Sequence, residues 1–186
     1  MNKHALAAGK IAGICLACIL LVVLARLLTA SAIERRGERE TYQILEGLAP
    51  GRAFGMFRPV EGKHPVLGFY PSWSGPGKAE TCIVQVQGNG YGGGFSLLAH
   101  CADDGEILGA RLLDNREIPG MGKAAQSPEY MDKFVGTGAA KPVPLDPKKL
   151  SQKDLAAVSG VSVTYAGIAR ALEQASAFVK AGGSKK

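Results

Sequence analysis

The chain has 186 residues, of which 46% are hydrophobic and 20% are charged, and it carries a formal net charge of +6 at pH 7. This length allows one sizeable domain with an appendage, but it excludes two domains of ordinary size. The basic residues are spread along the chain without interleaved aromatic side chains, which argues against a nucleic-acid interface and favours a solvated surface.

The N-terminal part of the chain contains a long apolar run. Between Ile11 and Leu28 the only charged residue is Arg26, and Lys10 lies at the other edge of the run. Such a segment is long enough to cross the hydrocarbon core of a bilayer, which is about 30 Å thick. We therefore predict a transmembrane helix over residues 10–30.

The residues on either side of this run give its orientation and an alternative. Lys3, Lys10 and the free amine precede the run, which weakly favours a cytoplasmic N-terminus over residues 1–9 and a soluble domain over residues 31–186 beyond the membrane. A signal peptide cleaved after Ala30-Ser31-Ala32 is the alternative, although the run is long for a signal peptide. The retained anchor is the interpretation that we favour.

Between the apolar run and residue 80 the pattern changes twice. A polar helix is predicted first, with Tyr42, Leu45 and Leu48 on one side and an end at Pro50-Gly51. Residues 52–80 contain many glycines and prolines, which favours short strands joined by turns.

A meander of three strands is predicted next, over residues 81–87, 95–101 and 106–114. The glycine-rich turn after the first strand places Cys82 and Cys101 at equal distances from its centre. If the turn closes a hairpin, the two cysteines face each other, either as a disulfide or as two buried thiols. A meander needs a cover on its apolar face, so flanking helices are expected.

The C-terminal third is predicted to supply these helices. A short helix follows Ser127, which is expected to cap it. A proline- and lysine-bearing loop leads to a longer final helix, whose end is expected to fray over residues 181–186. One face of the final helix carries Ile168, Ala169, Leu172, Ala175, Phe178 and Val179.

Three short motifs contain the residues best suited to hold an anion or a cofactor: Gly90–Gly94, Glu117–Lys123 and Ser159–Ser162. Each has an ordinary structural explanation, respectively as a hairpin turn, a loop after a strand and a helix cap. The third motif also suits a phosphate, because its glycine lets the backbone approach an anion at the positive end of a helix. Taken alone, local chemistry favours the cap.

Taken together and in this order, the motifs resemble a known family. The stretches "GYGGGFSLLAHCADDGEILGARLLDNREIPGMG" and "SGVS" are similar to the FMN-binding domain of membrane proteins with covalent flavin, specifically the G subunit of Rnf electron-transport complexes. The resemblance covers nearly the whole chain. It implies an α+β fold with a single N-terminal transmembrane helix followed by one FMN-binding domain, which has an antiparallel sheet and flanking helices.

The resemblance also implies a site. One FMN would be attached through its phosphate to the hydroxyl at the fourth position of the late motif, which is Ser162. This chain has Val161 and Ser162 where the family has alanine and threonine, so Thr164 is a second candidate acceptor. The other residues expected against the flavin are Ser159, Gly160, Val161, Glu117, Ile118, Pro119, Gly120, Met121, Gly122, Lys123 and Tyr91.

The same resemblance implies a setting. We expect an electron-transfer subunit in a bacterial inner membrane, with its soluble domain in the periplasm, in a complex that couples electron flow between ferredoxin and NAD to ion translocation. Its partners would be the other membrane and redox subunits and a flavin transferase. No metal site and no independent substrate chemistry are expected. Two alternatives stay open: a flavin-free, membrane-anchored scaffold or assembly subunit, and a secreted FMN protein released by cleavage.

Overall fold

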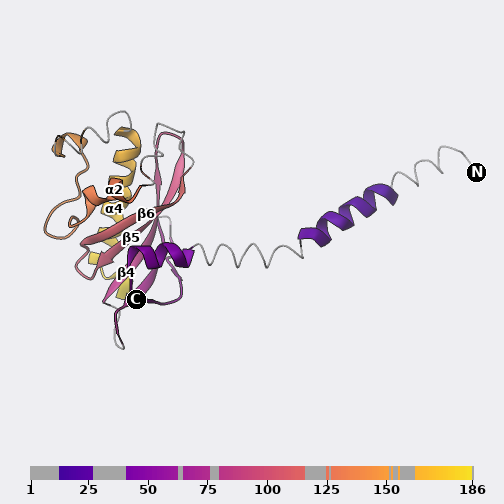
Figure 1. Ribbon diagram of the computed structural model, residues 1–186, viewed down its shortest axis with the longest axis horizontal. Coiled ribbons are helices and arrows are strands. Elements are labelled where there is room, and N and C mark those ends of the chain that lie inside the picture. Colours follow the sequence, from indigo (N-terminus) through magenta and orange to yellow (C-terminus); the bar gives the residue numbers. More distant parts are fainter. Residues whose placement is uncertain are drawn as a thin grey trace, which may run out of the picture. The chain divides into compact units, whose positions relative to one another are not determined.

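The computed structural model describes residues 13–26, 41–62, 65–75, 80–115, 125, 127–150, 152, 155 and 162–185. The chain divides into two compact units, Met1–Gln43 and Ile44–Lys186 (Figure 1).

A single apolar helix, residues 13–26, dominates the described part of the first unit. Its large hydrophobic side chains are exposed, from 52% at Val23 to 69% at Leu21. This helix lies within the predicted 10–30 segment, whose remaining residues lie outside the described ones, as do residues 1–9. Across the ranges that the structure describes, no helix has both the length and the apolar character needed to cross a membrane.

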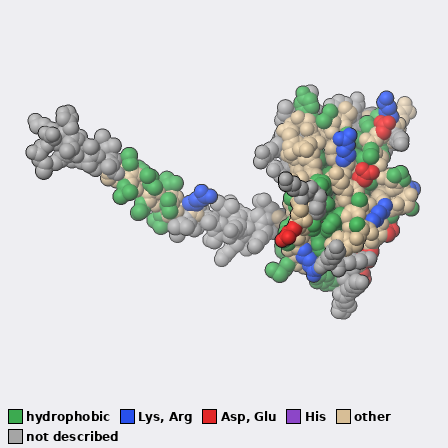
Figure 2. Space-filling view, turned by 180° about the vertical axis from the view of Figure 1, so that it is seen from behind, with side chains coloured by type: hydrophobic (Ala, Val, Ile, Leu, Met, Phe, Trp, Pro, Cys, Tyr) green, Lys and Arg blue, Asp and Glu red, His purple; other side chains and the backbone are tan. Residues whose placement is uncertain are grey.

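The second unit is built on a six-stranded antiparallel sheet. Its strands, in spatial order, are β1 (Ala53–Phe54), β3 (Val66–Trp73), β4 (Thr81–Asn89), β5 (Gly94–Ala102) and β6 (Ile107–Asn115), while β2 (Arg58–Pro59) also pairs with β3. The predicted meander is confirmed as β4, β5 and β6, with small shifts at the strand ends. On the side of this unit that Figure 2 shows, Lys and Arg side chains are interspersed with Asp and Glu side chains, as expected of a solvated surface.

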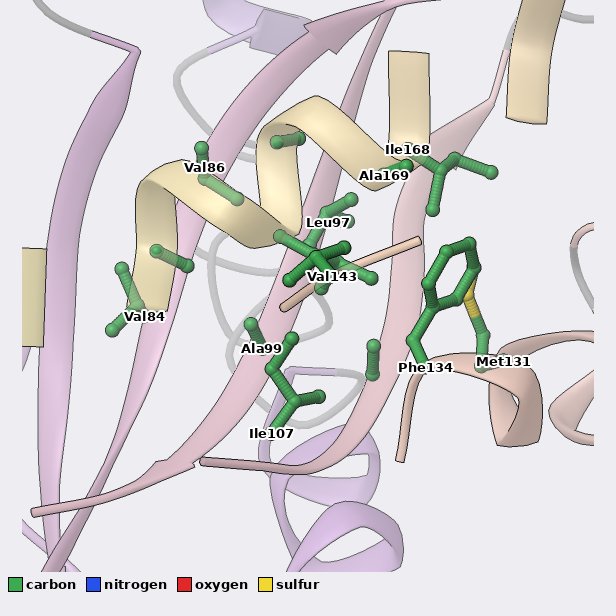
Figure 3. Packing of buried hydrophobic residues seen from close by; sticks show 14 of the residues in the cluster. Val84, Val86, Leu97, Ala99, Ile107, Met131, Phe134, Val143, Ile168 and Ala169 are labelled. Atoms are coloured by element: carbon green, nitrogen blue, oxygen red, sulfur yellow. The ribbon is translucent and has the colours of Figure 1, made fainter. Parts of the chain in front are cut away.

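One face of the sheet packs against the final helix, α4 (Ser162–Lys180). Alternate residues of β4 and β5 point to this face because side chains in a strand alternate between its two sides. Figure 3 shows the packing of Val84, Val86, Leu97, Ala99 and Ile107 with Ile168 and Ala169 of α4 and with Met131, Phe134 and Val143. The predicted apolar face of α4 is confirmed as buried, apart from Phe178, which is partly exposed.

Two short helices close the end of this core. They are α2 (Pro128–Met131) and the 3-10 helix η2 (Asp132–Phe134). The Oγ atom of Ser127 accepts a hydrogen bond from the Tyr130 N–H at 3.3 Å, so the predicted cap is confirmed. A further 3-10 helix, η3 (Pro147–Lys149), follows Asp146, whose carboxylate accepts from the Lys148 N–H at 2.9 Å.

A helix spans residues 41–48, and its part within the second unit, from Ile44 onward, covers the opposite face of the sheet. Leu45 and Ala49 form a small buried cluster with Ile83 and Leu98, and Leu48 packs against it. The predicted helix is therefore present, with Leu45 and Leu48 on its packed side. Tyr42, near the start of this helix, is 57% exposed.

A buried polar network lies on this second face. The Thr81 hydroxyl contacts Nε2 of His100 at 3.0 Å and the Ser72 hydroxyl at 2.9 Å, and it accepts from Arg52 at 3.2 Å. Arg52 also pairs with Glu80 at 3.4 Å. Burial lowers the pKa of His100, the nearby Arg52 guanidinium lowers it further, and a hydrogen bond to the backbone of Leu48 acts in the opposite direction.

The C-terminal residues turn back onto the domain. Gly182 has φ of 75° and donates its N–H to the Val179 carbonyl, which ends α4, and the 3-10 helix η4 (Gly183–Lys185) follows. A Cβ on Gly183 would lie 2.3 Å from the Phe178 ring. The expected fraying is therefore wrong for residues 181–185, because glycine lets the chain pack against this ring.

The two core cysteines are directly paired across β4 and β5, as their spacing from the turn predicts. Both are free thiols, and Cys82 and Cys101 are 4% and 0% exposed. Burial raises the pKa of Cys82 to about 11, and burial with Cys82 alongside raises the pKa of Cys101 further.

These thiols should react slowly, because the thiolate is the nucleophile. In the folded chain at about pH 8, iodoacetamide should leave Cys82 and Cys101 unmodified; Cys15 and Cys18 lie in the segment predicted to span the membrane and are read only after unfolding. All four should be alkylated in denaturant, as followed by peptide mass spectrometry. A Cys82–Cys101 cross-linked peptide in a non-reduced digest would contradict the free-thiol state.

The lowered pKa of His100 makes stability depend on pH. The folded state binds a proton at His100 less readily than the unfolded chain does, so unfolding becomes easier as pH falls through about 6.5. Between about pH 7.5 and about pH 5.5, the melting temperature should fall more for the natural chain than for His100→Gln, which does not titrate. Parallel melting curves for the two proteins would contradict this origin.

Candidate functional site

Helix α4 presents two hydroxyls of opposite character at its start. Ser162 is exposed, whereas Thr164 is 1% exposed. Two helical positions differ by about 200° around the axis, so the two side chains point in nearly opposite directions. The first backbone N–H groups of a helix lack an intrahelical acceptor and lie at the positive end of its dipole. The Ser162 hydroxyl therefore lies beside backbone donors that suit an anion.

The second part of the site is the turn Gly90–Gly93 between β4 and β5. The Gly90 N–H donates to the Gly93 carbonyl at 2.8 Å, which closes the turn. Gly93 has φ of 121°, a conformation that side-chain-bearing residues rarely adopt, so a glycine is required there. Tyr91 lies in this turn and is 60% exposed.

The turn and the helix meet in a direct contact. The Tyr91 backbone N–H donates to Oγ1 of Thr164 at 3.3 Å. Three residues further along α4, a Cβ built on Gly167 would lie 2.1 Å from the Asn89 carbonyl oxygen. The two backbones therefore approach more closely than any side chain at position 167 would allow.

A second tether holds the same part of α4 from another direction. The Tyr165 hydroxyl donates to the Pro144 carbonyl at 2.6 Å, and its ring stacks on Phe134 with centroids 5.3 Å apart. Burial, with Tyr165 alongside, raises the pKa of Tyr130 well above its usual range, so this neighbouring phenol stays neutral. The start of α4 is therefore held both by the β4–β5 turn and by the chain around residue 144.

A hollow of about 400 Å³ lies at the end of the β4–β5 hairpin. This volume is within the range of small-molecule sites. Its lining combines amide and hydroxyl groups with exposed backbone and one aromatic ring. The residues that line it are Pro65, Gln87, Gly88, Asn89, Gly94, Phe95 and Ser96.

Of the predicted site residues, the structure brings Tyr91 and Thr164 into contact, and it places Ser162 two residues before Thr164 on α4 with its side chain pointing the other way. Ser159, Gly160 and Val161 lie outside the described residues, and so does the whole Glu117–Lys123 loop with its Ile118, Pro119, Gly120, Met121 and Gly122. The roles expected of those residues stay predictions.

Sequence reasoning missed the residues that bring the turn and the helix together. Gly167 interrupts a helical pattern, and an isolated glycine there signals close packing only weakly. Asn89 and the lining of the hollow carry no motif, since their proximity arises from the hairpin register and from the approach of α4.

Residues 90–177 match the FMN-binding domain family. The match begins in the Gly90–Gly93 turn and ends within α4, so it includes both parts of the site. FMN is therefore the cofactor that the domain's family indicates.

Within that class, the chain is similar to the G subunits of ion-translocating oxidoreductase complexes. It is 37% identical over 71 residues to the G subunit of the ion-translocating oxidoreductase complex of two strains of Cereibacter sphaeroides. The aligned residues make up 37% of this chain and 32% of each relative. It is 28% identical over 127 residues to the G subunit of the proton-translocating ferredoxin:NAD(+) oxidoreductase complex of Clostridium ljungdahlii, which covers 66% and 65% of the two chains. The resemblance to the G subunit of Rnf-type complexes is confirmed, and the chain matches less than two thirds of the length of each relative.

Proposed function

We propose that the chain is an electron-transfer subunit that carries one FMN, linked by a phosphoester to Ser162, in a membrane complex of the Rnf type. The observation that supports this most is the contact between the Gly90–Gly93 turn and the start of α4, because it joins two separate motifs of the matched domain beside an exposed hydroxyl. When bound, the flavin supplies reversible electron transfer through its isoalloxazine ring.

The two candidate acceptors differ in access. Thr164 is 1% exposed and its Oγ1 already accepts the Tyr91 N–H, so its oxygen is turned into the protein. Ser162 is exposed at the start of the helix, where an enzyme can reach it. This contrast favours Ser162, although serine replaces the threonine of the family motif.

The residues around Ser162 suit a phosphodiester. The start of α4 offers backbone N–H groups and a favourable dipole for the negative charge. Val163, the next residue, is 55% exposed and offers apolar surface beside the attachment point, and Tyr91, in the turn that contacts α4 at Thr164, is 60% exposed. The hollow at the hairpin end adds amide groups from Gln87 and Asn89. The Glu117–Lys123 loop is proposed to complete the site.

Attachment requires an activated donor, because an ester does not form from free phosphate without removing water. Oγ of Ser162 would form a bond to the flavin phosphorus, while the bond from that phosphorus to a nucleotide leaving group of a flavin dinucleotide breaks. The hydroxyl proton would pass to a base on a flavin transferase. The contribution of this chain is to present the hydroxyl at a fixed place.

The membrane setting belongs to the same proposal. A helix whose apolar side chains are exposed all round suits lipid, and residues 13–26 are of this kind. We place a single span at residues 10–30 of a bacterial inner membrane, the N-terminus in the cytoplasm and the FMN domain in the periplasm. The curated relatives are named as subunits of ion-translocating oxidoreductase complexes, which supports the other subunits of such a complex as partners and ferredoxin and NAD as its redox couple.

Peptide mass spectrometry on the chain purified from its native membrane tests the attachment. The peptide with Ser162 should carry an FMN-sized mass increment, which Ser162→Ala should lose completely because no oxygen remains to form the ester. Ser162→Thr is the matched control and should keep the increment, since it restores the hydroxyl type of the family motif.

Two results would contradict this assignment in different ways. An increment that survives in Ser162→Ala would move the acceptor to Thr164. An unmodified natural chain, from cells in which other flavin-linked proteins are modified, would favour the flavin-free scaffold.

A further inference from the structure

The contact between the β4–β5 turn and α4 has a role that goes beyond packing. We propose that Thr164 and Gly167 are positioning residues, which hold the Gly90–Gly93 turn on the first turns of α4 and so fix the position of this turn relative to Ser162. This inference rests on the proposed attachment at Ser162 and deepens it. Thr164 therefore positions the turn, and it is not the hydroxyl to which the flavin phosphate is attached.

We call the contact of the Gly90–Gly93 turn with Thr164 and Gly167 of α4 the clamp. Thr164 supplies its hydrogen bond. Its Oγ1 accepts the Tyr91 N–H across 73 positions of sequence, in a part-buried contact. Water cannot replace the acceptor easily, because Thr164 is 1% exposed. A backbone N–H that loses its partner in such a place is costly, so removing this one oxygen favours release of the turn.

Gly167 supplies the steric half, one helical turn further along the same side of α4. A Cβ there would lie 2.1 Å from the Asn89 carbonyl oxygen and 3.0 Å from the Asn89 carbonyl carbon. These are backbone atoms, which cannot rotate away as a side chain can. Glycine is otherwise a poor helix residue, so the close approach explains its presence.

Tyr165 determines which side of the clamp moves when the clamp opens. Its hydrogen bond to Pro144 and its stacking on Phe134 hold the start of α4 independently of the turn. If the clamp opens, the turn with Tyr91 therefore moves relative to Ser162, while the helix stays in place. The hollow at the hairpin end and the exposed Tyr91 ring would then lose their fixed relation to the acceptor hydroxyl.

Two consequences are measurable. Ser162 should receive flavin from a flavin dinucleotide more slowly, because the transferase meets a less defined surface, with the same bonds formed and broken as above. The attached flavin should also be less ordered, because the turn beside it has moved.

The experiment uses the full chain with a flavin transferase and a flavin dinucleotide. Thr164→Val keeps the shape of the side chain and removes the oxygen that accepts the Tyr91 N–H. It should slow flavin attachment at Ser162 about fivefold and lower the fluorescence anisotropy of the attached flavin. Thr164→Ser keeps this hydroxyl oxygen. It should restore the attachment rate and the anisotropy to within about twofold of the natural chain.

A glycine pair tests the steric half. Gly167→Ala keeps the Thr164 hydroxyl but displaces the turn, so it should behave like Thr164→Val. Gly47→Ala is the matched control, because a Cβ on this helical glycine meets only the flexible end of Arg111 at 3.5 Å. It should leave both measurements unchanged.

Amide hydrogen exchange at Tyr91 in the flavin-free chain separates failure of this inference from failure of the proposed function. Protection of this amide in the natural chain and its loss in Thr164→Val are expected. Modification of Thr164→Val at the natural rate with unchanged anisotropy, or failure of Thr164→Ser to restore them, would overturn the positioning role. A natural chain that protects Tyr91 but never accepts flavin would overturn the proposed function, and the positioning role with it.

Discussion

The close approach of α4 to the β4–β5 hairpin is the constraint on which the site depends. At Gly167 the helix lies against the Asn89 backbone at a distance that excludes a side chain. That distance allows the Thr164 hydroxyl to reach the Tyr91 N–H and buries Thr164 while Ser162 stays exposed. A wider spacing would leave the same residues in the sequence without the contact that joins the two motifs. The packing distance between the helix and the hairpin thus decides which of the two hydroxyls at the start of α4 faces solvent.

The sheet separates this site from a second, differently built face. Residues of β4 and β5 that point toward α4 are almost entirely apolar, whereas the opposite side carries Ser72, Thr81 and His100 in a buried hydrogen-bonded network beneath the helix at residues 41–48. The apolar face supplies most of the hydrophobic stabilisation. The polar face joins Arg52, in the segment before the sheet, to Thr81 and His100 through hydrogen bonds. Because the pKa of His100 is lowered there, the stability of the domain depends on pH.

Much of this arrangement could be predicted because it depends on local pattern. Short runs bounded by turn signals predicted β4 to β6, Ser127 was predicted as a cap, and the centre of the glycine turn placed Cys82 opposite Cys101. The missed features depend on contacts between distant segments. The C-terminal glycines predict fraying when only the sequence is considered, whereas in the fold Gly183 packs against the Phe178 ring. In the site, the family motifs led to Ser162, Thr164 and Tyr91, whereas Gly167 and Asn89 acquire their meaning only when the helix lies on the hairpin.

The most direct test of the account is electron transfer in native membranes that contain either the natural chain or Ser162→Ala at equal abundance. Electron flow between ferredoxin and NAD, and the ion gradient coupled to it, should be lost in Ser162→Ala and kept in Ser162→Thr, because the proposed electron route passes through a flavin held at this hydroxyl. Undiminished electron flow and ion uptake with Ser162→Ala, in membranes where the chain carries no flavin, would contradict the account and leave the chain a structural component of its complex.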